Sequence, residues 1–255
     1  MEKVMIKMFA LVKISLIFVF INHVYAFDQS HKDWDEIIKG HTSKEHSQIL
    51  FNYKKLKNND EKLNQYLKKL SEVSKEEFKS FSKNAQLAFW INTYNAFTVK
   101  LILNHFPVKS IKDTGSFFSS PWKKKFFKIF GEKISLDGIE HGIIRKEFKE
   151  PRIHFAVNCA SIGCPSLLQE AFVKDQLERQ FDRAAKNFVL NKNKNYYDKK
   201  SKTLYLSKIF QWYGADFDEK HQSAQAYVQG VLKLDKSVVN NVRYLDYDWS
   251  LNHIK

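Results

Sequence analysis

The chain contains few of the residues that cross-link, interrupt or divide a fold. It has two cysteines, four prolines and eight glycines among 255 residues. No internal repeat and no Gly/Ser-rich linker occurs in it, so the sequence predicts one globular domain. No segment after residue 26 is apolar over the roughly 20 residues that a membrane-spanning helix needs. Apolar and aromatic residues are abundant enough to form a core, so folding does not depend on disulfides.

The first residues have the pattern of a secretory signal peptide. Lys3 and Lys7 precede an apolar segment, Met8 to Ile21, and Val24-Tyr-Ala26 provides small residues at the positions that a signal peptidase reads. The alternative is an uncleaved membrane anchor, but Lys13 interrupts the apolar run. The residue directly after the cleavage point is not a cysteine, which argues against a lipid anchor. We therefore expect cleavage after Ala26 and a mature protein, residues 27–255, that is periplasmic or secreted.

Positive charge dominates the sequence. The net charge is +14, and removal of residues 1–26, with three lysines and one glutamate, leaves +12. Such a charge would suit anionic partners, for example an envelope polymer or an acidic peptide. The lysines are scattered, however, and this favours the plainer interpretation of a solvated surface. An exported chain without a recognisable binding motif is not expected to bind nucleic acid. The sequence indicates neither a cofactor nor an oligomeric state.

The order of the expected elements indicates the α+β class. Residues 84–104 are apolar on nearly every side of a helix, which is typical of a helix at the centre of a domain. Further helices are expected at 136–145, 174–190 and 223–234, and a hairpin at 196–206. Helices and short strands do not alternate regularly, which disfavours a doubly wound sheet. We expect a mainly helical domain around a long buried helix, with a small, mostly antiparallel sheet.

Both cysteines lie in one short stretch after Pro151. The apolar run Ile153–Val157 predicts a buried strand that would deliver Cys159 to its end. A disulfide between Cys159 and Cys164 is one interpretation, because exported proteins meet an oxidising compartment. A free nucleophilic Cys159 is the second. The third is a metal site in which the thiols converge with His141, His154 or Glu140.

The expected helix at 136–145 contains a possible acid–base group. Asp137 and His141 are four residues apart and therefore share a helix face. A carboxylate beside a histidine can orient the ring and stabilise its charged form. The plainer interpretation is a surface ion pair. Glu140 points about 100° away from His141, where it could act as an acid–base group or bind an arginine.

Three further residues, His154, Asn92 and Asn95, concern the same chemistry. If residues 153–157 form a regular strand, His154 and Cys159 face opposite sides, which makes His141 the better candidate base. Asn92 and Asn95 lie on the buried helix, where an amide must find partners. Either could orient a histidine or stabilise an oxyanion. More often, such residues bind the backbone of a loop.

Several blocks together resemble the domain of unknown function 547 family. They are Phe89–Ala96, Ile134–Ile143, Arg152–Ser161 with Cys164-Pro165, and Tyr247–Asn252, so the resemblance runs from about Trp34 to Asn252. It implies that six of the candidate residues occupy motif positions: Asn92, Asn95, Glu140, His141, His154 and Cys159. In the family's pattern the first cysteine is more regular than the second, which favours a role for Cys159 itself.

Two main hypotheses of function follow. The first is an exported cysteine hydrolase or acyltransferase of the cell envelope, with Cys159 as nucleophile and His141 as base, oriented by Asp137, Glu140 or an asparagine. The second is a non-enzymatic binding or structural module of the periplasm with a Cys159–Cys164 disulfide. The distance between the Cys159 sulfur and the His141 ring would discriminate between them.

Overall fold

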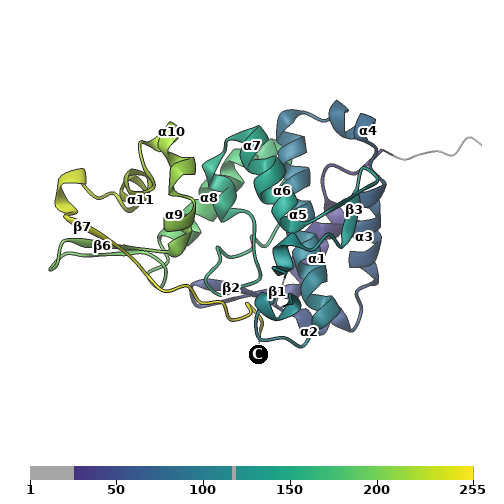
Figure 1. The fold of residues 1–255 in the computed structure, drawn as a ribbon, viewed down its shortest axis with the longest axis horizontal. Coiled ribbons are helices and arrows are strands. Elements are labelled where there is room, and N and C mark those ends of the chain that lie inside the picture. The colour runs from purple at the N-terminus through teal and green to yellow at the C-terminus, as the bar shows by residue number, and fades with distance from the viewer. Residues whose placement is uncertain (1–25, 117–118, 255) are drawn as a thin grey trace, which may run out of the picture.

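A computed structural model describes residues 26–116 and 119–254 of the chain. The predicted signal peptide, residues 1–26, lies outside the described residues except for Ala26. The fold is α+β and mainly helical, as the sequence predicted. Figure 1 shows α3 and α4 at one end of the molecule and the strands β6 and β7 at the other. The helix α5 lies between α3 and α4 on one side and the later helices on the other.

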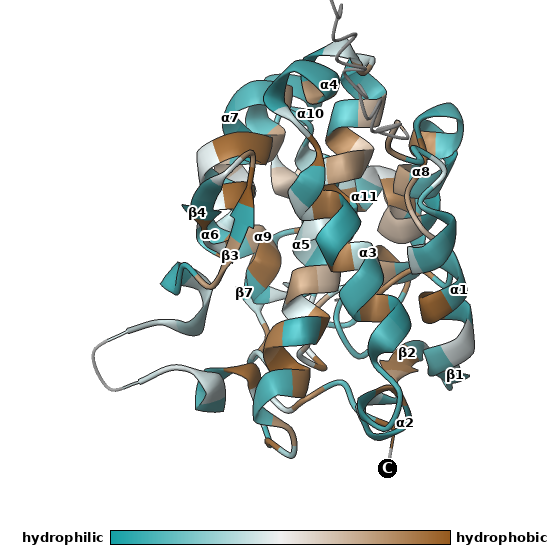
Figure 2. Ribbon diagram, turned by 90° about the vertical axis from the view of Figure 1, so that its right-hand side faces the viewer, coloured by the Kyte–Doolittle hydropathy of each residue, from teal (hydrophilic) through white to brown (hydrophobic). Residues whose placement is uncertain are grey.

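The N-terminal part packs short helices around a hairpin. Its elements are α1 (Lys32–His41), β1 (Thr42–Glu45), β2 (Gln48–Phe51), α2 (Tyr53–Lys57), α3 (Glu61–Glu72) and α4 (Lys75–Ser80). Apolar residues of α3 recur at helical spacing and are buried, for example Leu63, Leu67 and Leu70. Figure 2 shows the result as alternating hydrophilic and hydrophobic segments along α3. These helices therefore contribute one face each to the core.

The helix α5 (Lys83–His105) is the centre of the fold. It is 23 residues long and 17 of them are buried. The hydroxyl of Ser82 accepts a hydrogen bond from the amide of Ala85 at its start. The chain leaves the helix through Phe106 and a cis peptide bond to Pro107. The expected central helix at 84–104 is confirmed.

A hairpin and an interrupted helix follow. The elements are η1 (Ile111–Thr114), η2 (Pro121–Lys123), β3 (Phe127–Ile129), β4 (Glu132–Ile134), α6 (Leu136–Ile139), η3 (Glu140–Ile144) and α7 (Arg145–Phe148). The helix expected at 136–145 is present, but its middle part, η3, is a π-helix. Such wide turns often occur at functional sites.

The prediction of a strand at 153–157 is wrong. Residues Pro151–Phe155 form a 3-10 helix, η4, in which the Glu150 side chain accepts a hydrogen bond from the Arg152 amide. Residues 153–158 are all buried. A continuous apolar run is compatible with a buried strand or a buried helical turn, and periodicity does not separate the two.

The C-terminal part contains the remaining elements. They are η5 (Lys174–Gln176), α8 (Leu177–Val189), β5 (Tyr196–Asp198), β6 (Thr203–Leu206), α9 (Lys208–Trp212), η6 (Gly214–Phe217), α10 (Asp218–His221), α11 (Ala224–Leu232), η7 (Lys236–Val238) and β7 (Asn241–Tyr244). The expected hairpin and the helices at 174–190 and 223–234 are thus present. In place of one small sheet, the described residues form three: β1–β2, β3–β4 and β5–β6–β7, in which β6 and β7 are parallel.

Candidate functional site

A cavity of about 330 Å³ lies between the helix 136–148, the cysteine loop and the C-terminal segment. Its walls combine aromatic rings, two carboxylates, two histidines and both cysteines. The residues that line it are Tyr94, Trp122, Asp137, Glu140, His141, His154, Val157, Cys159, Cys164, Pro165, Ile209, Trp212, Tyr213, Tyr247 and Trp249. Five of the seven candidate residues line this cavity: Asp137, Glu140, His141, His154 and Cys159.

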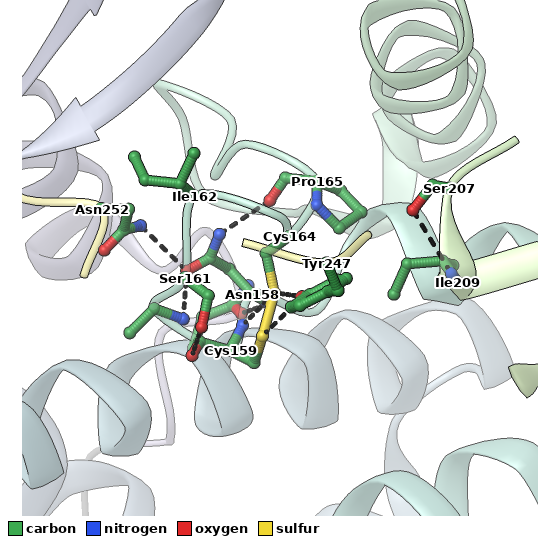
Figure 3. Close-up of a disulfide and its surroundings, with 12 residues drawn as sticks. Asn158, Cys159, Ser161, Ile162, Cys164, Pro165, Ser207, Ile209, Tyr247 and Asn252 are labelled. Carbon is green, nitrogen blue, oxygen red and sulfur yellow. Dashed lines mark hydrogen bonds between the residues drawn. A yellow bond between two sulfur atoms is a disulfide. The ribbon is translucent and has the colours of Figure 1, made fainter. Parts of the chain in front are cut away.

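The two cysteines form a disulfide in the wall of the cavity. Their Cα atoms are 6.2 Å apart. Cys164 is buried, whereas Cys159 is half-buried. The amide of Cys159 donates a hydrogen bond to the Cys164 sulfur at 3.0 Å. Disulfide sulfurs carry no hydrogen, so the Tyr247 hydroxyl is the donor in its 3.2 Å contacts to each of them (Figure 3).

Gly163 allows the C-terminal segment to reach the cysteine loop. A Cβ atom at this position would lie 2.9 Å from the Asp248 carbonyl oxygen and 2.9 Å from the Tyr247 ring. The amide of Gly163 donates to that carbonyl at 2.8 Å, and the amide of Ile162 donates to the Ser250 carbonyl at 2.8 Å. Close backbone approach of this kind requires a residue without a side chain.

Asn95 binds the backbone on the approach to the cysteines. Its Nδ2 donates to the Ala156 carbonyl at 2.9 Å, and its Oδ1 accepts from the Asn158 amide at 2.8 Å. Asn158 in turn accepts from the Ala160 amide and donates to the Pro165 carbonyl. Both ends of the Asn95 amide therefore fix the loop from the buried helix.

Asn92 does the same one turn away. Its Nδ2 donates to the Phe172 carbonyl at 2.7 Å, and its Oδ1 accepts from the Phe172 amide at 3.0 Å. Neither Asn92 nor Asn95 lines the cavity. Both amides carry out the loop-binding role that was the plainer alternative for them.

Asp137 and His141 lie on one side of the helix 136–148, as their spacing predicted. The distance from Asp137 Oδ1 to His141 Nε2 is 3.9 Å, longer than a hydrogen bond. On the other side of the ring, Arg145 Nη1 lies 3.3 Å from His141 Nδ1. Since Arg145 can only donate, Nδ1 is the acceptor and the ring proton is on Nε2, toward Asp137.

Glu140 is a buried carboxylate, 6% exposed. It lies beside Tyr94 and Tyr213, and both burial of these phenols and the Glu140 charge raise their pKa values above the ordinary range. The phenols thus stay protonated and can donate to the carboxylate. No ion pair joins Glu140 to Arg145 or Arg152 among the described residues. Arg145 binds Asp216, and Arg152 binds Glu150, Glu178 and Asp182.

His154 is paired with a carboxylate that the sequence did not reveal. Its Nε2 lies 2.7 Å from Asp216 Oδ2, and its ring stacks on Tyr213 at a centroid distance of 4.0 Å. Arg145 donates to both oxygens of Asp216 at 2.6 and 2.7 Å. Burial alone would raise the pKa of Asp216, but the hydrogen bonds from His154 and Arg145 outweigh it and hold that pKa well below its usual range. The carboxylate is therefore charged, and His154 donates from Nε2.

Neither histidine has a hydrogen bond to the Cys159 sulfur in the part of the chain that the structure describes. A regular strand would have placed His154 and Cys159 on opposite faces, but η4 replaces that strand. A helical turn brings His154 and Cys159 to the same cavity. His154 has the better oriented ring of the two histidines, because its carboxylate lies at hydrogen-bond distance.

Aromatic rings form the remaining wall of the cavity. Tyr247 and Trp249 are 4.5 Å apart at their ring centroids, and Trp212 lies 4.9 Å from Tyr247 and 5.9 Å from Trp249. Trp122 packs edge-on against Trp249 at 5.7 Å. Trp212 is 44% exposed, which is unusual for the largest apolar side chain.

Sequence reasoning missed this wall and the carboxylate Asp216. Trp212, Tyr213 and Asp216 are distant from the cysteines in sequence, and no spacing rule connects them. Tyr247 and Trp249 belong to a block that carried the family resemblance, and this was the available signal. Side chains brought together by tertiary packing leave no periodic pattern in the sequence.

Two negative findings concern residues 26–116 and 119–254. No three His, Cys, Asp or Glu side chains within these ranges are grouped so that they would hold a metal ion. No helix within them combines the length and the apolar character needed to cross a bilayer. The sulfurs of both cysteines are used by the disulfide.

The fold and the cavity define a class: an α+β domain with a disulfide in the wall of an aromatic cavity. Residues 78–189 match the family described as "Protein of unknown function, DUF547", so this segment belongs to the family that its blocks resembled. The match is shorter than the expected range from Trp34 to Asn252. It contains the first three blocks and ends before Tyr247. No curated protein and no solved structure matches the chain.

Proposed function

We propose that the protein is an exported binding module of the cell envelope, in which the Cys159–Cys164 disulfide stabilises a ligand-binding cavity. The observation that carries this proposal is the bond between the two sulfurs in the cavity wall. A cysteine in a disulfide is not a nucleophile. Residues 27–255 would act as one domain after removal of residues 1–26, and an oxidising compartment would maintain the disulfide.

The contacts around the disulfide support a structural role. Tyr247 donates to its sulfurs, and the backbone of 248–250 accepts from the amides of Ile162 and Gly163. The disulfide closes the cysteine loop on itself, and the hydrogen bonds attach this loop to the segment that carries Tyr247 and Trp249. A loop made rigid in this way would give that segment a fixed place to dock.

The first experiment measures the intact mass of freshly isolated protein before and after thiol alkylation without reductant. The proposal expects no added alkyl group and an N-terminus at Phe27. Two alkylated cysteines would contradict the structural disulfide. A mass that retains residues 1–26 in the exported fraction would contradict the cleavage.

A second candidate function is the cysteine hydrolase or acyltransferase, acting after reduction by a dithiol of the compartment. The observation that favours it is that His154, which is bonded to Asp216, lines the same cavity as Cys159. Asp216 accepts from Nε2, which leaves Nδ1 of a neutral ring as the base. Nδ1 would take the thiol proton of Cys159, and the thiolate would attack an acyl carbon. The leaving group would depart with that proton, and water would release the acyl group.

Activity of reduced and oxidised protein on a panel of amide and thioester substrates tests this candidate. It expects turnover only after reduction, loss of that turnover in Cys159→Ser, and retention in Cys164→Ser. Equal rates in Cys159→Ser and the reduced wild type would exclude Cys159 as the nucleophile. A Lys192→Ala variant, altered outside the cavity, controls for general effects of substitution.

A further inference from the structure

The cavity differs in charge from the rest of the molecule. The chain has 42 Lys and Arg against 28 Asp and Glu. The described residues that line the cavity nevertheless include the carboxylates Asp137 and Glu140 and neither lysine nor arginine. We infer that this cavity binds an aliphatic primary ammonium group, carried by a free amine or by the side chain of a lysine-like residue in a peptide. The inference rests on the proposed binding function and specifies its ligand.

The carboxylates and His154 offer hydrogen-bond acceptors on one side of the cavity, whereas the tyrosine hydroxyls of the lining are donors. Glu140 and Asp137 provide carboxylate oxygens. His154 is 2% exposed and donates from Nε2 to Asp216, and its Nδ1 has no hydrogen-bond partner among the described residues. A buried ring nitrogen without a partner costs free energy unless a ligand satisfies it. An ammonium group has three donors and no acceptor, which matches this set.

The nearby cations do not cancel the acidic wall. Arg145 gives hydrogen bonds to both oxygens of Asp216, which pairs its charge, although the guanidinium also contacts His141 and the Tyr213 ring of the lining. The ammonium of Lys112 lies 3.8 Å from the centroid of the Trp249 ring and is not among the lining groups. That contact also demonstrates that an ammonium group can approach the Trp249 ring closely in this fold.

The aromatic wall suits the rest of such a ligand. Trp212 is the most exposed ring there, and it borders Tyr247 and Trp249. Methylene groups next to an ammonium group carry part of its positive charge, and ring faces attract them in addition to burying their apolar surface. A cavity of about 330 Å³ accommodates a ligand of this size.

Calorimetric titration with four probes tests the inference. The probes are n-hexylammonium chloride, 1-hexanol, sodium hexanoate and Nα-acetyl-lysine N-methylamide. We expect n-hexylammonium to bind at least 10-fold more tightly than 1-hexanol, and hexanoate to bind more weakly still. The ratio of the affinities for n-hexylammonium and the lysine derivative then identifies the source, a free amine or a peptide side chain.

Matched variants assign the preference to the cavity. Glu140→Gln should weaken n-hexylammonium binding about 10-fold while changing the affinity for 1-hexanol less than 2-fold. Asp137→Asn provides a second variant in case the buried substitution affects folding, which the Tm of each variant reveals. Glu147→Gln removes the same charge from the exposed side of the same helix and should leave all affinities unchanged.

The outcomes separate this inference from the proposed function. If 1-hexanol or hexanoate binds as tightly as n-hexylammonium, or if none of the probes binds, the ammonium inference is overturned, whereas the binding module still stands on its disulfide. If alkylation finds free thiols, the structural disulfide fails, whatever the probes show. An ammonium preference that survives both acidic substitutions would also overturn the inference.

Discussion

The two buried asparagines of α5 and the polar side chains of the cavity wall differ in their hydrogen bonds. On α5, the amides of Asn92 and Asn95 are bonded at both ends to loop backbone. In the cavity wall, His154 keeps one ring nitrogen without a protein partner among the described residues, and the buried carboxyl group of Glu140 lies beside two phenols with no arginine or lysine in an ion pair with it. Satisfied groups stabilise the fold, whereas unsatisfied ones lower stability and remain free to bind something else.

This difference assigns two roles within one family segment. Asn92, Asn95, Glu140 and His154 all lie in residues 78–189, so the family match does not distinguish them. The partners of each side chain do. We therefore expect substitutions on α5 to reduce stability strongly, and substitutions in the cavity to reduce binding with little effect on stability.

Among substitutions at and beside the cysteine loop, the largest loss of stability is expected for Asn95→Ala. The variant leaves the Ala156 carbonyl and the Asn158 amide buried without partners. Each such group costs about 1–3 kcal/mol, so the free energy of unfolding should fall by about 3 kcal/mol in denaturant titrations. The control is Asn64→Ala, an exposed asparagine on α3, for which a change of less than about 0.5 kcal/mol is expected. Similar losses in both would remove the special role of Asn95.

The next largest loss is expected when the disulfide is removed. Closing a loop this short stabilises a protein by about 2 kcal/mol in the chain-entropy model. The free energy of unfolding of the double variant Cys159→Ala/Cys164→Ala should therefore be lower than that of the oxidised wild type by that amount. Reduced wild type serves as the comparison, since it breaks the same bond without removing the sulfurs. A double variant as stable as the oxidised protein would argue that the cross-link is not structural.

Acid should lower the free energy of unfolding through His31. This residue is buried beside the Tyr66 hydroxyl, and burial lowers its pKa to about 3. The unfolded chain binds a proton below the ordinary histidine pKa of about 6.5, whereas the folded chain does not. Stability is therefore lost as the pH falls from about 6.5 toward 3, by on the order of 1–2 kcal/mol between pH 7 and pH 5.

The His31→Asn variant isolates this contribution. His31 has a left-handed backbone with φ of 52°, which asparagine tolerates well. Its unfolding free energy should depend less on pH between 7 and 5 than that of the wild type. An unchanged slope would place the acid sensitivity elsewhere.

The smallest effect on stability is expected for Trp212→Ala in the cavity wall. Because the side chain is 44% exposed, its removal should cost less than about 1 kcal/mol. Binding of n-hexylammonium should nevertheless weaken several-fold. The matched core variant is Trp34→Ala, which removes a fully buried indole and should cost at least about 3 kcal/mol. A cavity variant as unstable as the core variant would contradict the division between the two regions.

The sequence predicted the helices well because their signals are local. The helix at 84–104 and the helix at 174–190 follow from apolar spacing and from breakers within a few residues. The stretch at 153–157 was mistaken for a strand because burial on all sides gives the same apolar run in both conformations. For the site, spacing placed Asp137 near His141, whereas the His154–Asp216 contact joins residues 62 positions apart. Contacts of that kind arise from packing and leave no local pattern.

The approach of the 247–250 segment to Gly163 has a consequence for how the cavity comes into being. Tyr247 lies 88 positions beyond Cys159 along the chain, and together with Trp249 it supplies part of the aromatic wall. During synthesis, α5 and the cysteine loop would emerge well before this segment. The two sulfurs can then meet early, because only four residues separate them, whereas the ligand site closes only when the last wall docks. Maturation of the protein would thus run from oxidation to binding competence, in that order.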